Sequence, residues 1–586
     1  MSIPNEPTYG PTLKISEEIH AMKYREKLES FKECVVRNAT AMTDSQEHFT
    51  AFKDILLNMR FLAAGRVQAA MGAVKVVTPY NCFVSETIED SMEGIMTAVT
   101  RAAQTMRLGG GIGYDFSTIR PAGDMIRSLE SRASGPIPVM GIFDATCAMI
   151  ASAGHRRGAQ MGVLRVDHPD IEEFIRAKQN DNILTNFNIS VGITNEFMAC
   201  VEHNKPFDLR YNGKVYRTIN ATALWDEILR ATWDWAEPGV LFIDQINEKN
   251  NLYYCESIVA TNPCGEQPLP PNGACLLGSF NLVKYVNKWE RQIDYKQLAD
   301  DIPHVVRAMD NVIDRAVYPL MEQEQEAKSK RRMGLGVTGV ANAIEALGYP
   351  YGSPDFMAEF EIVLKVLRNG CYNASVDLAI EKGVFPLYDA GYHKHSMFIQ
   401  TLPPYLRERI ERHGIRNSHL LSIAPTGTIS LTADNVSSGL EPVFSYGYDR
   451  TINMSSTNTV VEHVSDYGYR VFGTKGRKAD DIHVSDHVAV LNLASRYVDS
   501  ACSKTCNVGD DVTWDEFKDV YMQAFKGGAS GCTTFRASGK RYGILNASAV
   551  EDVATSEEPK EQDKFINETD GAACFFDPAT GQRSCE

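Results

Sequence analysis

The chain has 586 residues, a formal net charge of −16 at pH 7, and 44% hydrophobic and 23% charged residues. These values are typical of a globular protein with one large α/β domain or two or three ordinary domains. The acidic charge disfavours binding to nucleic-acid backbones but leaves room for a local basic cleft that binds a small phosphorylated ligand. With no long apolar stretch and no secretion signal, we expect a cytoplasmic protein with no membrane or nucleic-acid partner.

Capped helical segments alternate with short β-branched runs along the chain. Helices are predicted at residues 44–59, 354–383 and 514–525, from Ser or Asp caps, a proline in the first turn and glycine stops. Strands are predicted at residues 74–77, 161–166 and 189–191. This alternation predicts an α/β fold. Residues 551–564 are rich in Glu, Asp, Lys, Ser and Pro and are predicted to form a mobile linker.

The thirteen cysteines include no Cys-x-x-Cys pair, so no structural zinc site is expected. Cys264 stands out because it lies in Asn262-Pro263-Cys264-Gly265-Glu266, followed by further prolines. Such a segment forms neither a regular helix nor a central strand, so the thiol lies on a stiff, irregular loop. The composition of this loop alone does not decide between a catalytic thiol and a buried turn.

Three further segments are ambiguous when taken singly. Residues 274–282 form an apolar run in which Cys275 is a small hydrophobic residue of a buried strand, and Cys82 lies in a strand-like segment at 79–84. Residues 424–430 place hydroxyl groups and backbone N–H groups around Gly427, which is typical of a phosphate-binding loop. Each pattern is also common in proteins in which the cysteine is not catalytic and the loop binds no phosphate.

Taken in order, these motifs resemble the catalytic subunit of ribonucleotide reductases, most closely the adenosylcobalamin-dependent class. The matching stretches are residues 81–84, 186–191, 262–266, 274–282, 332–339 and 424–430, within a resemblance from about 50 to 545. The resemblance implies a ten-stranded α/β barrel of two five-stranded parallel half-sheets with a central finger loop. It divides the chain into an N-terminal helical segment (1–60), the barrel with its effector-specificity region (61–548), and a flexible linker with a cysteine-bearing tail (549–586).

The resemblance also implies a role for each matching catalytic residue. Cys264 would carry a thiyl radical that takes hydrogen from C3′ of a ribonucleotide, and Glu266 would accept the 3′-hydroxyl proton. Asn262 would orient the ribose hydroxyls. Cys82 and Cys275 would supply the reducing equivalents and become a disulfide, which requires their Cα atoms to lie within about 7 Å.

Binding residues follow in the same way. The substrate would contact Asn81, Pro425, Thr426, Gly427, Thr428 and Ile429, and a deoxynucleoside triphosphate effector would contact Asp90, Arg120, Ile126 and Arg127. Arg157 and Gln160 would belong to a loop that links effector to substrate, although Arg156 and Arg157 could instead be a solvated basic pair. Cys574 and Cys585 match the tail thiols that reduce the active-site disulfide, but ten residues separate them and family tails often carry a tighter pair. Two exposed thiols without this role remain the alternative.

The radical source is inferred by elimination. Residues 531–536 lack the tyrosine pair of subunits that receive a radical from a metalloprotein, and the Arg-Val-Phe-Gly stretch at 470–473 is not a glycyl-radical loop. Adenosylcobalamin is therefore the expected cofactor, with no protein metal ligand. The expected partners are a ribonucleoside di- or triphosphate, a dNTP effector, a thioredoxin- or glutaredoxin-like reductant and, by analogy, a second copy of the chain. The alternatives are a catalytic subunit that needs a separate metalloprotein, and an inactive nucleotide-binding homologue.

The first fifty residues are too short for the additional nucleotide-binding cap of some family members. We therefore expect control of substrate specificity without an on/off switch.

Overall fold

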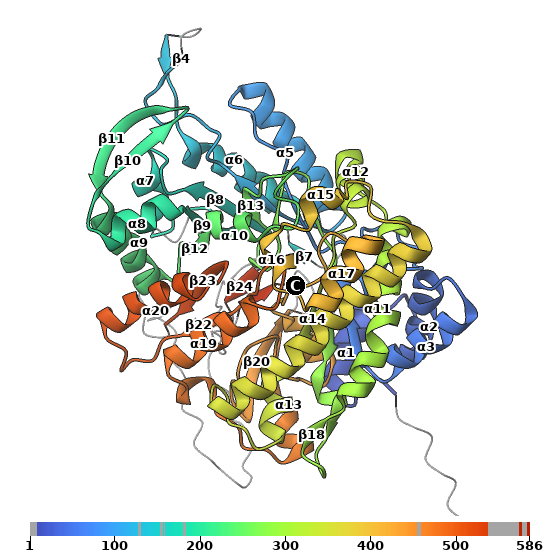
Figure 1. The fold of residues 1–586 in the computed structure, drawn as a ribbon. Coiled ribbons are helices and arrows are strands. Elements are labelled where there is room, and N and C mark those ends of the chain that lie inside the picture. The colour runs from blue at the N-terminus through green and yellow to red at the C-terminus, as the bar shows by residue number, and fades with distance from the viewer. Residues whose placement is uncertain are drawn as a thin grey trace, which may run out of the picture.

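The computed structural model describes residues 9–126, 130–152, 156–157, 159–179, 183–453, 459–536, 574–576 and 583–585 (Figure 1). An eight-stranded sheet forms one side of the body. In spatial order it consists of β15 (Ala274–Cys275), β2 (Cys82–Val84), β3 (Gly111–Asp115), β8 (Gln160–Arg165), β9 (Phe187–Ile193), β12 (Gly239–Phe242), β23 (Gly531–Phe535) and β22 (Thr505–Asn507).

The five central strands of this sheet, β2 to β12, are all parallel. The chain crosses between them through α5 (Met92–Arg107), α6 (Pro136–Met149), α7 (Ile171–Arg176) and α9 (Ala221–Trp235). Strands covered in this way are apolar along their whole length, and β8 and β9 confirm the strands predicted at 161–166 and 189–191. The five-stranded parallel half-sheet expected from the sequence is therefore present, with β15 antiparallel at one edge and β23 antiparallel at the other.

The second sheet is smaller. It contains β1 (Phe61–Ala63), β16 (Leu277–Asn281) and β19 (Gly334–Thr338), and it continues only through isolated parallel bridges, Leu335 to Leu421 and Ile423 to Cys502. The backbone N–H groups of Leu420 and Leu421 donate to the Asp499 carboxylate, at 2.8 and 2.9 Å. The Asp499 side chain thus binds N–H groups that could otherwise pair with a neighbouring strand. In the described residues, strand pairing therefore gives one eight-stranded and one three-stranded sheet. The closed ten-stranded barrel is not seen in this pairing.

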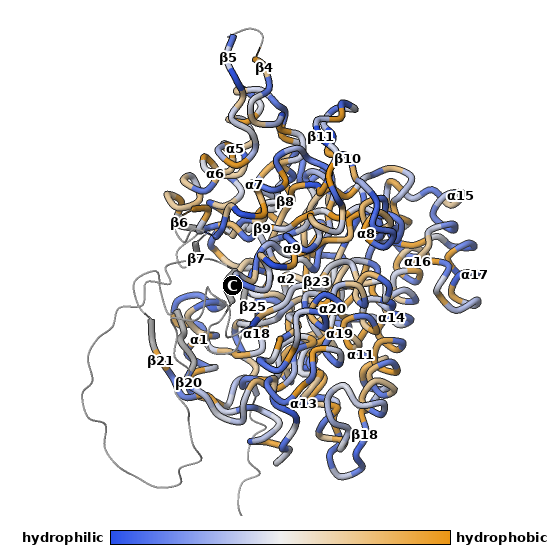
Figure 2. Tube along the Cα trace, turned by 90° about the vertical axis from the view of Figure 1, so that its left-hand side faces the viewer, coloured by the Kyte–Doolittle hydropathy of each residue, from blue (hydrophilic) through white to orange (hydrophobic). Residues whose placement is uncertain are grey.

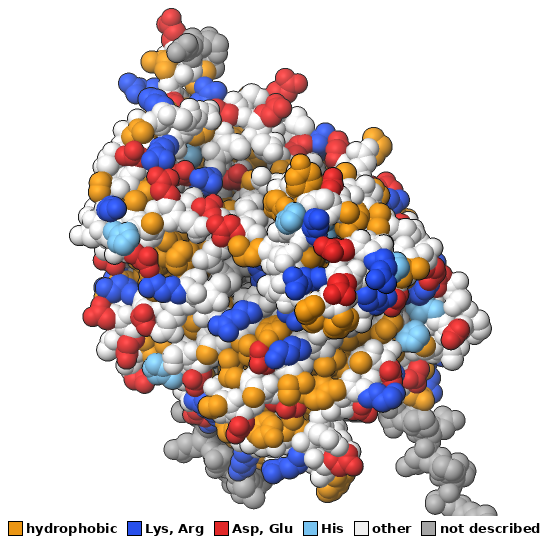
Figure 3. Space-filling model, in the orientation of Figure 1, with side chains coloured by type: hydrophobic (Ala, Val, Ile, Leu, Met, Phe, Trp, Pro, Cys, Tyr) orange, Lys and Arg blue, Asp and Glu red, His pale blue; other side chains and the backbone are white. Residues whose placement is uncertain are grey.

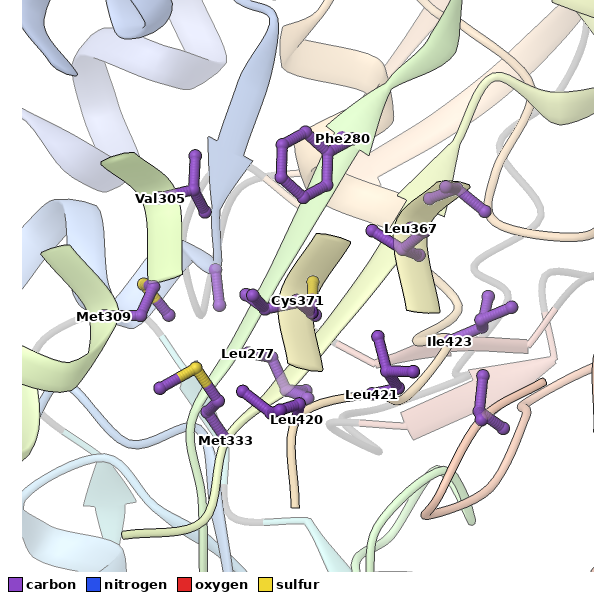
Figure 4. Close-up of a cluster of buried hydrophobic side chains, with 14 of the residues drawn as sticks. Leu277, Phe280, Val305, Met309, Met333, Leu367, Cys371, Leu420, Leu421 and Ile423 are labelled. Carbon is purple, nitrogen blue, oxygen red and sulfur yellow. The ribbon is translucent and has the colours of Figure 1, made fainter. Parts of the chain in front are cut away.

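Long helices cover the second sheet. Figure 4 shows Phe280 of β16, Met309 of α11 (Tyr295–Arg315) and Cys371 of α14 (Pro354–Lys382) in one buried cluster with Leu421 and Ile423. The predicted helix at 354–383 is confirmed as α14, which Ser353 caps and Gly383 ends. The helix predicted at 514–525 is confirmed as α20 (Trp514–Lys526).

Two local predictions were wrong. Residues 74–77 form no strand, because Val74 and Val76 are 87% and 70% exposed and nothing pairs with this stretch. The apolar run 274–282 is not one strand: it divides at Leu276 into β15, which pairs with β2, and β16, which pairs with β1 and β19. The run thereby passes from one sheet to the other.

The N-terminal helices α1 (Lys14–Tyr24), α2 (Phe31–Met42) and α3 (Gln46–Leu57) pack into the same core as the sheets. Phe52 of α3 contacts Phe61 of β1, with ring centroids 6.5 Å apart. The helix predicted at 44–59 is confirmed as α3, capped by Ser45. The proposed domain boundary at residue 60 is thus crossed by a continuous apolar core, and the division into domains stays a prediction.

Figure 2 shows hydrophilic and hydrophobic residues alternating along the chain, and Figure 3 shows acidic and basic side chains mixed over one face of the surface. Among the residues described, no helix is long and apolar enough to cross a membrane. The linker predicted at 551–564 lies outside the described residues. At the C-terminal end, β24 (Cys574–Phe576) pairs antiparallel with β25 (Arg583–Cys585), and β25 lies beside α18 (Gly427–Thr432).

Candidate active site

The finger loop is a tight hairpin that presents Cys264 at its tip. Its stems are β13 (Ala260–Thr261) and β14 (Pro268–Leu269), paired antiparallel. Across the tip, the Asn262 N–H donates to the Gln267 carbonyl at 3.1 Å, and the Gln267 N–H donates to the Asn262 side-chain oxygen at 2.9 Å. Gly265 has a φ of 84°, which a glycine adopts without strain. These bonds fix the direction in which Cys264 points.

Both sheets hold the finger. From β9, the Asn188 side chain donates to the Pro263 carbonyl at 3.2 Å. From the opposite side, the Ser422 hydroxyl donates to the Glu266 carbonyl at 2.8 Å, and the Ala501 N–H reaches the same carbonyl at 3.1 Å. The tip is therefore anchored to β9 on one side and to the extended segments that contain Ser422 and Ala501 on the other, which is the rigid placement that a reactive group requires.

A cavity of about 140 Å³ opens beside the tip. Its lining includes nine of the predicted catalytic and substrate-binding residues: Cys264, Glu266, Asn81, Cys82, Pro425, Thr426, Gly427, Thr428 and Ile429. Asn262 and Cys275 are fully buried behind this lining. Stretches up to 348 positions apart in the sequence thus meet at one cavity.

Cys82 and Cys275 face each other across two paired strands. The register of β2 and β15 sets Cys82 directly opposite Cys275, a position at which Cα atoms lie about 4.5–5.5 Å apart. This is within the distance required for a disulfide. Burial, with Cys82 and the Glu266 carboxylate nearby, raises the pKa of the Cys275 thiol well above its usual range. Cys275 therefore keeps its proton at neutral pH, as a hydrogen donor must.

Cys264 is disulfide-bonded in this structure, whereas Cys82 and Cys275 are present as thiols. A thiyl radical can form only from the S–H form of Cys264. Reduction of this bond must therefore precede any radical chemistry at the finger tip.

Two amide side chains at the site have unused hydrogen-bonding capacity. The Asn262 side-chain nitrogen and the Asn81 side-chain oxygen are buried, and neither has a hydrogen-bond partner among the described residues. Leaving a buried polar atom unpaired costs about 1–3 kcal/mol. A ligand with hydroxyl groups would satisfy one donor and one acceptor here, which agrees with a ribose.

The two threonine hydroxyl groups of the loop at 425–429 differ: one is bonded within the protein, and the other lines the cavity. Thr426, with a φ of 54°, places its hydroxyl within 2.9 Å of the Thr338 and Ser430 hydroxyls and accepts from the Gly439 N–H at 2.7 Å. A hydroxyl has one donor and two acceptor positions, so the Thr426 side chain is fully engaged within the protein. Thr428 makes no side-chain hydrogen bond in the described part of the chain and is half-buried in the cavity lining.

The predicted effector residues are only partly brought together. Arg120 donates to the Asp90 carboxylate at 2.6 Å, just before Ser91 caps α5. Ile126 lies in β4 (Met125–Ile126), part of a hairpin that projects from the body (Figure 1). Arg127 lies outside the described residues. The pair Asp90–Arg120 is thus a charged feature at the start of α5, and the effector role stays a prediction.

The predicted specificity-loop residues differ in their surroundings. Gln160 begins β8 and is 1% exposed, accepting from the Tyr114 hydroxyl at 2.9 Å. Arg157 lies in β7 (Arg156–Arg157), which pairs with β6 (Ala151–Ser152), and its side chain is not described. Gln160 is therefore a core residue at the base of the segment.

A second, smaller cavity of about 30 Å³ adjoins Cys264 near β12 and β23. Its lining includes Gly265, Ser503, Gly531 and Thr533, and no tyrosine is among the described lining residues. Cys264 thus borders two cavities, one with the predicted substrate residues and one without.

Sequence reasoning missed the part of the cavity wall that α1 and α4 (Gly65–Ala70) form, including its two basic residues, Lys23 and Arg66. Neither belongs to a motif, and no spacing connects them to the finger loop. A signal that could have drawn attention to Arg66 is that it is the one charged residue in the stretch 61–71.

The comparisons with known proteins agree with this geometry. The family model "Ribonucleotide reductase, barrel domain" matches residues 80–535. The chain belongs to the ribonucleotide reductase family. It is 32% identical to the "Vitamin B12-dependent ribonucleoside-diphosphate reductase" of Thermoplasma acidophilum, over 95% of this chain and 74% of that protein. It is 34% identical to a protein of the same name from Mycobacterium tuberculosis (strain CDC 1551), over 80% of this chain and 69% of that protein.

A third relative is more distant. The "Vitamin B12-dependent ribonucleotide reductase" of Streptomyces clavuligerus is 27% identical over 83% of this chain and 59% of that protein.

Proposed function

We propose that the protein reduces ribonucleotides to 2′-deoxyribonucleotides by a thiyl-radical mechanism that depends on adenosylcobalamin. The observation that carries the proposal is the cavity that brings together Cys264 and Glu266 of the finger with Cys82, whose cross-strand partner is Cys275. Similarity to three proteins named as vitamin B12-dependent reductases supports the cofactor.

In this proposal each residue has one task. Cys264, as a thiyl radical, removes the hydrogen atom from C3′, and Glu266 accepts the 3′-hydroxyl proton. Asn262, whose amide nitrogen lacks a partner among the described residues, holds the ribose hydroxyls. Cys82 and Cys275 give up two hydrogens and form a disulfide: one hydrogen leaves with the 2′-hydroxyl as water, and the other goes to C2′. Glu266 then returns its proton to the 3′-oxygen while Cys264 returns its hydrogen to C3′, so electrons and protons balance.

The second cavity at Cys264 contains none of the predicted substrate residues, but at about 30 Å³ it is too small to hold a corrin. When bound, adenosylcobalamin would supply the radical that oxidises the Cys264 thiol. Ser503 and Thr533 offer hydroxyl groups on the cavity wall next to this thiol. We propose that the corrin itself holds the cobalt.

We further propose that the extended segments around Leu421 and Cys502 complete the second half of a ten-stranded barrel. The single parallel bridges from Leu335 and Ile423 support this arrangement, since each has the direction of a strand pair.

Effector control and dimerisation form a second part of the proposal. A dNTP would bind near Asp90 and Arg120, at the start of α5, and select the substrate through residues 153–160. Exposed methionines lie on the neighbouring helices: Met92 and Met96 of α5 and Met149 of α6 are 71%, 45% and 78% exposed. Exposed apolar side chains on two neighbouring helices favour a helix–helix contact with a second copy. Size-exclusion chromatography with and without dNTP tests this part.

The reductant would be a thioredoxin- or glutaredoxin-like protein that acts through Cys574 and Cys585. The register of β24 and β25 sets the two positions opposite each other, and β25 lies beside α18 of the cavity. Both observations support a tail dithiol that can form a disulfide and approach the site. Cys574→Ser should spare turnover with a small dithiol and reduce it with a protein reductant; equal loss with both would contradict the shuttle role.

The decisive assay is anaerobic incubation of the fully reduced chain with adenosylcobalamin, effector, ribonucleotide and a small dithiol. Formation of deoxyribonucleotide, with a coupled cobalt–thiyl signal in electron paramagnetic resonance, is the expected result. Turnover only after addition of a separate metalloprotein subunit would exclude the proposed radical source. Nucleotide binding without turnover under any condition would identify an inactive homologue.

A further inference from the structure

The main cavity contains two basic side chains that its predicted function did not use. Lys23 and Arg66 are half-buried and line the cavity together with Cys264 and the loop 425–429. They come from α1 and α4, outside all the motifs that identified the site. Glu266 is the one acidic residue among the described lining residues, so the helices contribute two basic side chains to this cavity in a protein whose net charge is −16.

The position of Lys23 follows from how α1 is attached. The Ser16 hydroxyl donates to the Leu431 carbonyl of α18 at 2.6 Å, and the N–H groups of Thr12 and Leu13 donate to the Asp434 carboxylate at 2.7 and 2.9 Å. Figure 2 shows α1 beside α18. The last turn of α1, which carries Lys23, therefore reaches the end of the cavity where the 425–429 loop enters α18.

Two close approaches fix the position of Arg66 next to α1 and Gly109. A Cβ atom at Gly65 would lie 2.6 Å from the Tyr24 ring, so the first residue of α4 packs directly on the last residue of α1. A Cβ atom at Gly109 would lie 2.4 Å from the Arg66 guanidinium, so this head group lies over the glycine that precedes β3. Gly109 thus leaves the space that Arg66 occupies.

A neutral loop alone is a poor match for an anionic group. The Thr426 hydroxyl is engaged with Thr338, Ser430 and Gly439, which leaves the Thr428 hydroxyl and backbone N–H groups on that wall. A phosphate group carries nearly two negative charges at neutral pH. Guanidinium groups bind phosphate oxygens in a bidentate manner, and a lysine supplies a compact charge.

We propose that Lys23 and Arg66 bind the phosphate groups of the substrate, so that the N-terminal helices form one wall of the substrate site. The inference rests on the proposed function for the identity of the substrate, and it adds two charged ligands to the neutral loop. It also explains why α1 is hydrogen-bonded to α18: these bonds keep a fixed distance between the basic side chains of the N-terminal helices and the loop 425–429.

The test uses the full chain with Lys23→Gln, Arg66→Gln and the double variant. Lys14→Gln is the matched control, since it removes the same charge from the same helix at a side chain that is 89% exposed. We expect KM for a ribonucleoside diphosphate to rise about 10-fold in each single variant and about 100-fold in the double variant, from the worth of charged hydrogen bonds. kcat should change less than about 3-fold, and Arg66→Lys should recover part of the loss. Lys14→Gln should keep the wild-type KM.

Inorganic pyrophosphate separates this inference from the proposed function. As a competitive ligand followed by calorimetry, it should bind the wild type and Lys14→Gln equally and bind Lys23→Gln and Arg66→Gln at least 10-fold more weakly. If the wild type reduces no ribonucleotide, the proposed function fails while the pyrophosphate result still tests the cations. Unchanged KM and unchanged pyrophosphate binding in folded variants, checked by circular dichroism, would overturn the inference. A KM that rises equally in Lys14→Gln would do the same.

Discussion

Replacement of Gly113 by Ala should disable the active site without unfolding the protein. Gly113 lies in β3, next to the base of the finger loop, and a Cβ atom there would be 1.9 Å from the Thr261 carbonyl oxygen. Thr261 ends β13 and directly precedes Asn262. A methyl group on β3 therefore collides with the backbone that carries Cys264, in a region where nothing flexible can yield.

The displacement can be worked out from the contact. Real Cβ atoms essentially never lie closer than 3.0 Å to another heavy atom of this kind. The distance between the new Cβ atom and the Thr261 carbonyl oxygen must therefore increase by at least about 1.1 Å. The finger is anchored beyond this point through Pro263 and Glu266, so the movement becomes a tilt or distortion at the tip. A misplacement of about 1 Å in a catalytic group costs on the order of 100-fold in rate. The overpacking itself should cost about 1–3 kcal/mol of stability.

Gly192→Ala is the matched control. Gly192 lies in β9 of the same parallel half-sheet, and its added Cβ atom would meet Val163 at 3.6 Å, an ordinary van der Waals contact. Deoxyribonucleotide formation and thermal unfolding should be measured for both variants. We expect Gly113→Ala to lose about 100-fold in kcat while remaining folded, and Gly192→Ala to stay within about 3-fold of the wild type. Wild-type activity in Gly113→Ala, or equal losses in both variants, would refute the reasoning.

Three further predictions concern single side chains. Cys264→Ala should abolish deoxyribonucleotide formation and the cobalt–thiyl signal while leaving the thermal unfolding curve of the fully reduced chain unchanged; residual turnover would exclude Cys264 as the radical carrier. Cys275→Ser should stop multiple turnover because no disulfide with Cys82 can form, and mass spectrometry of alkylated wild-type protein after one turnover should find the Cys82–Cys275 bond, whose absence would contradict the pairing. Burial raises the pKa of Glu345 to about 7 from 4.5, so the folded state holds a proton that the unfolded state releases, and stability should fall by about 3 kcal/mol as the pH rises from about 4.5 to 7. Glu345→Gln should flatten this part of the dependence of the unfolding free energy on pH, and an unchanged slope in denaturant titrations would contradict the shifted pKa.

Local signals in the sequence predicted the helices well. Ser353, Pro354 and Gly383 mark both ends of α14, because capping and stopping depend only on neighbouring residues. The strand predicted at 74–77 failed because β-branched residues favour a strand only where a partner strand exists, and the exposed Val74 and Val76 have none. The division of 274–282 at Leu276 was equally hidden, since it depends on which sheets lie on either side.

The candidate site was predicted by motif order rather than by physical pattern. Cys82 and Cys275 are opposite each other only because β15 runs antiparallel to β2, and no local periodicity encodes a pairing over that distance. Thr426 shows the opposite limitation: its residue type fits a phosphate ligand, but its hydroxyl is used up in a network with Thr338 and Ser430. Residue type predicts what a side chain can do, and packing decides whether it is available.

The same argument explains why the finger needs both sheets. A thiyl radical oxidises most groups that it contacts, so selectivity must come from what Cys264 can reach. Asn188 from β9 and Ser422 beside β19 hold the tip from two sides, and Gly113 allows the backbone to approach closely enough for both bonds to form. Replacing any one of these three removes a restraint on the same atom, the Cys264 sulfur. Their effects on kcat should therefore be far from additive, because once the tip is loose a second loosening changes little.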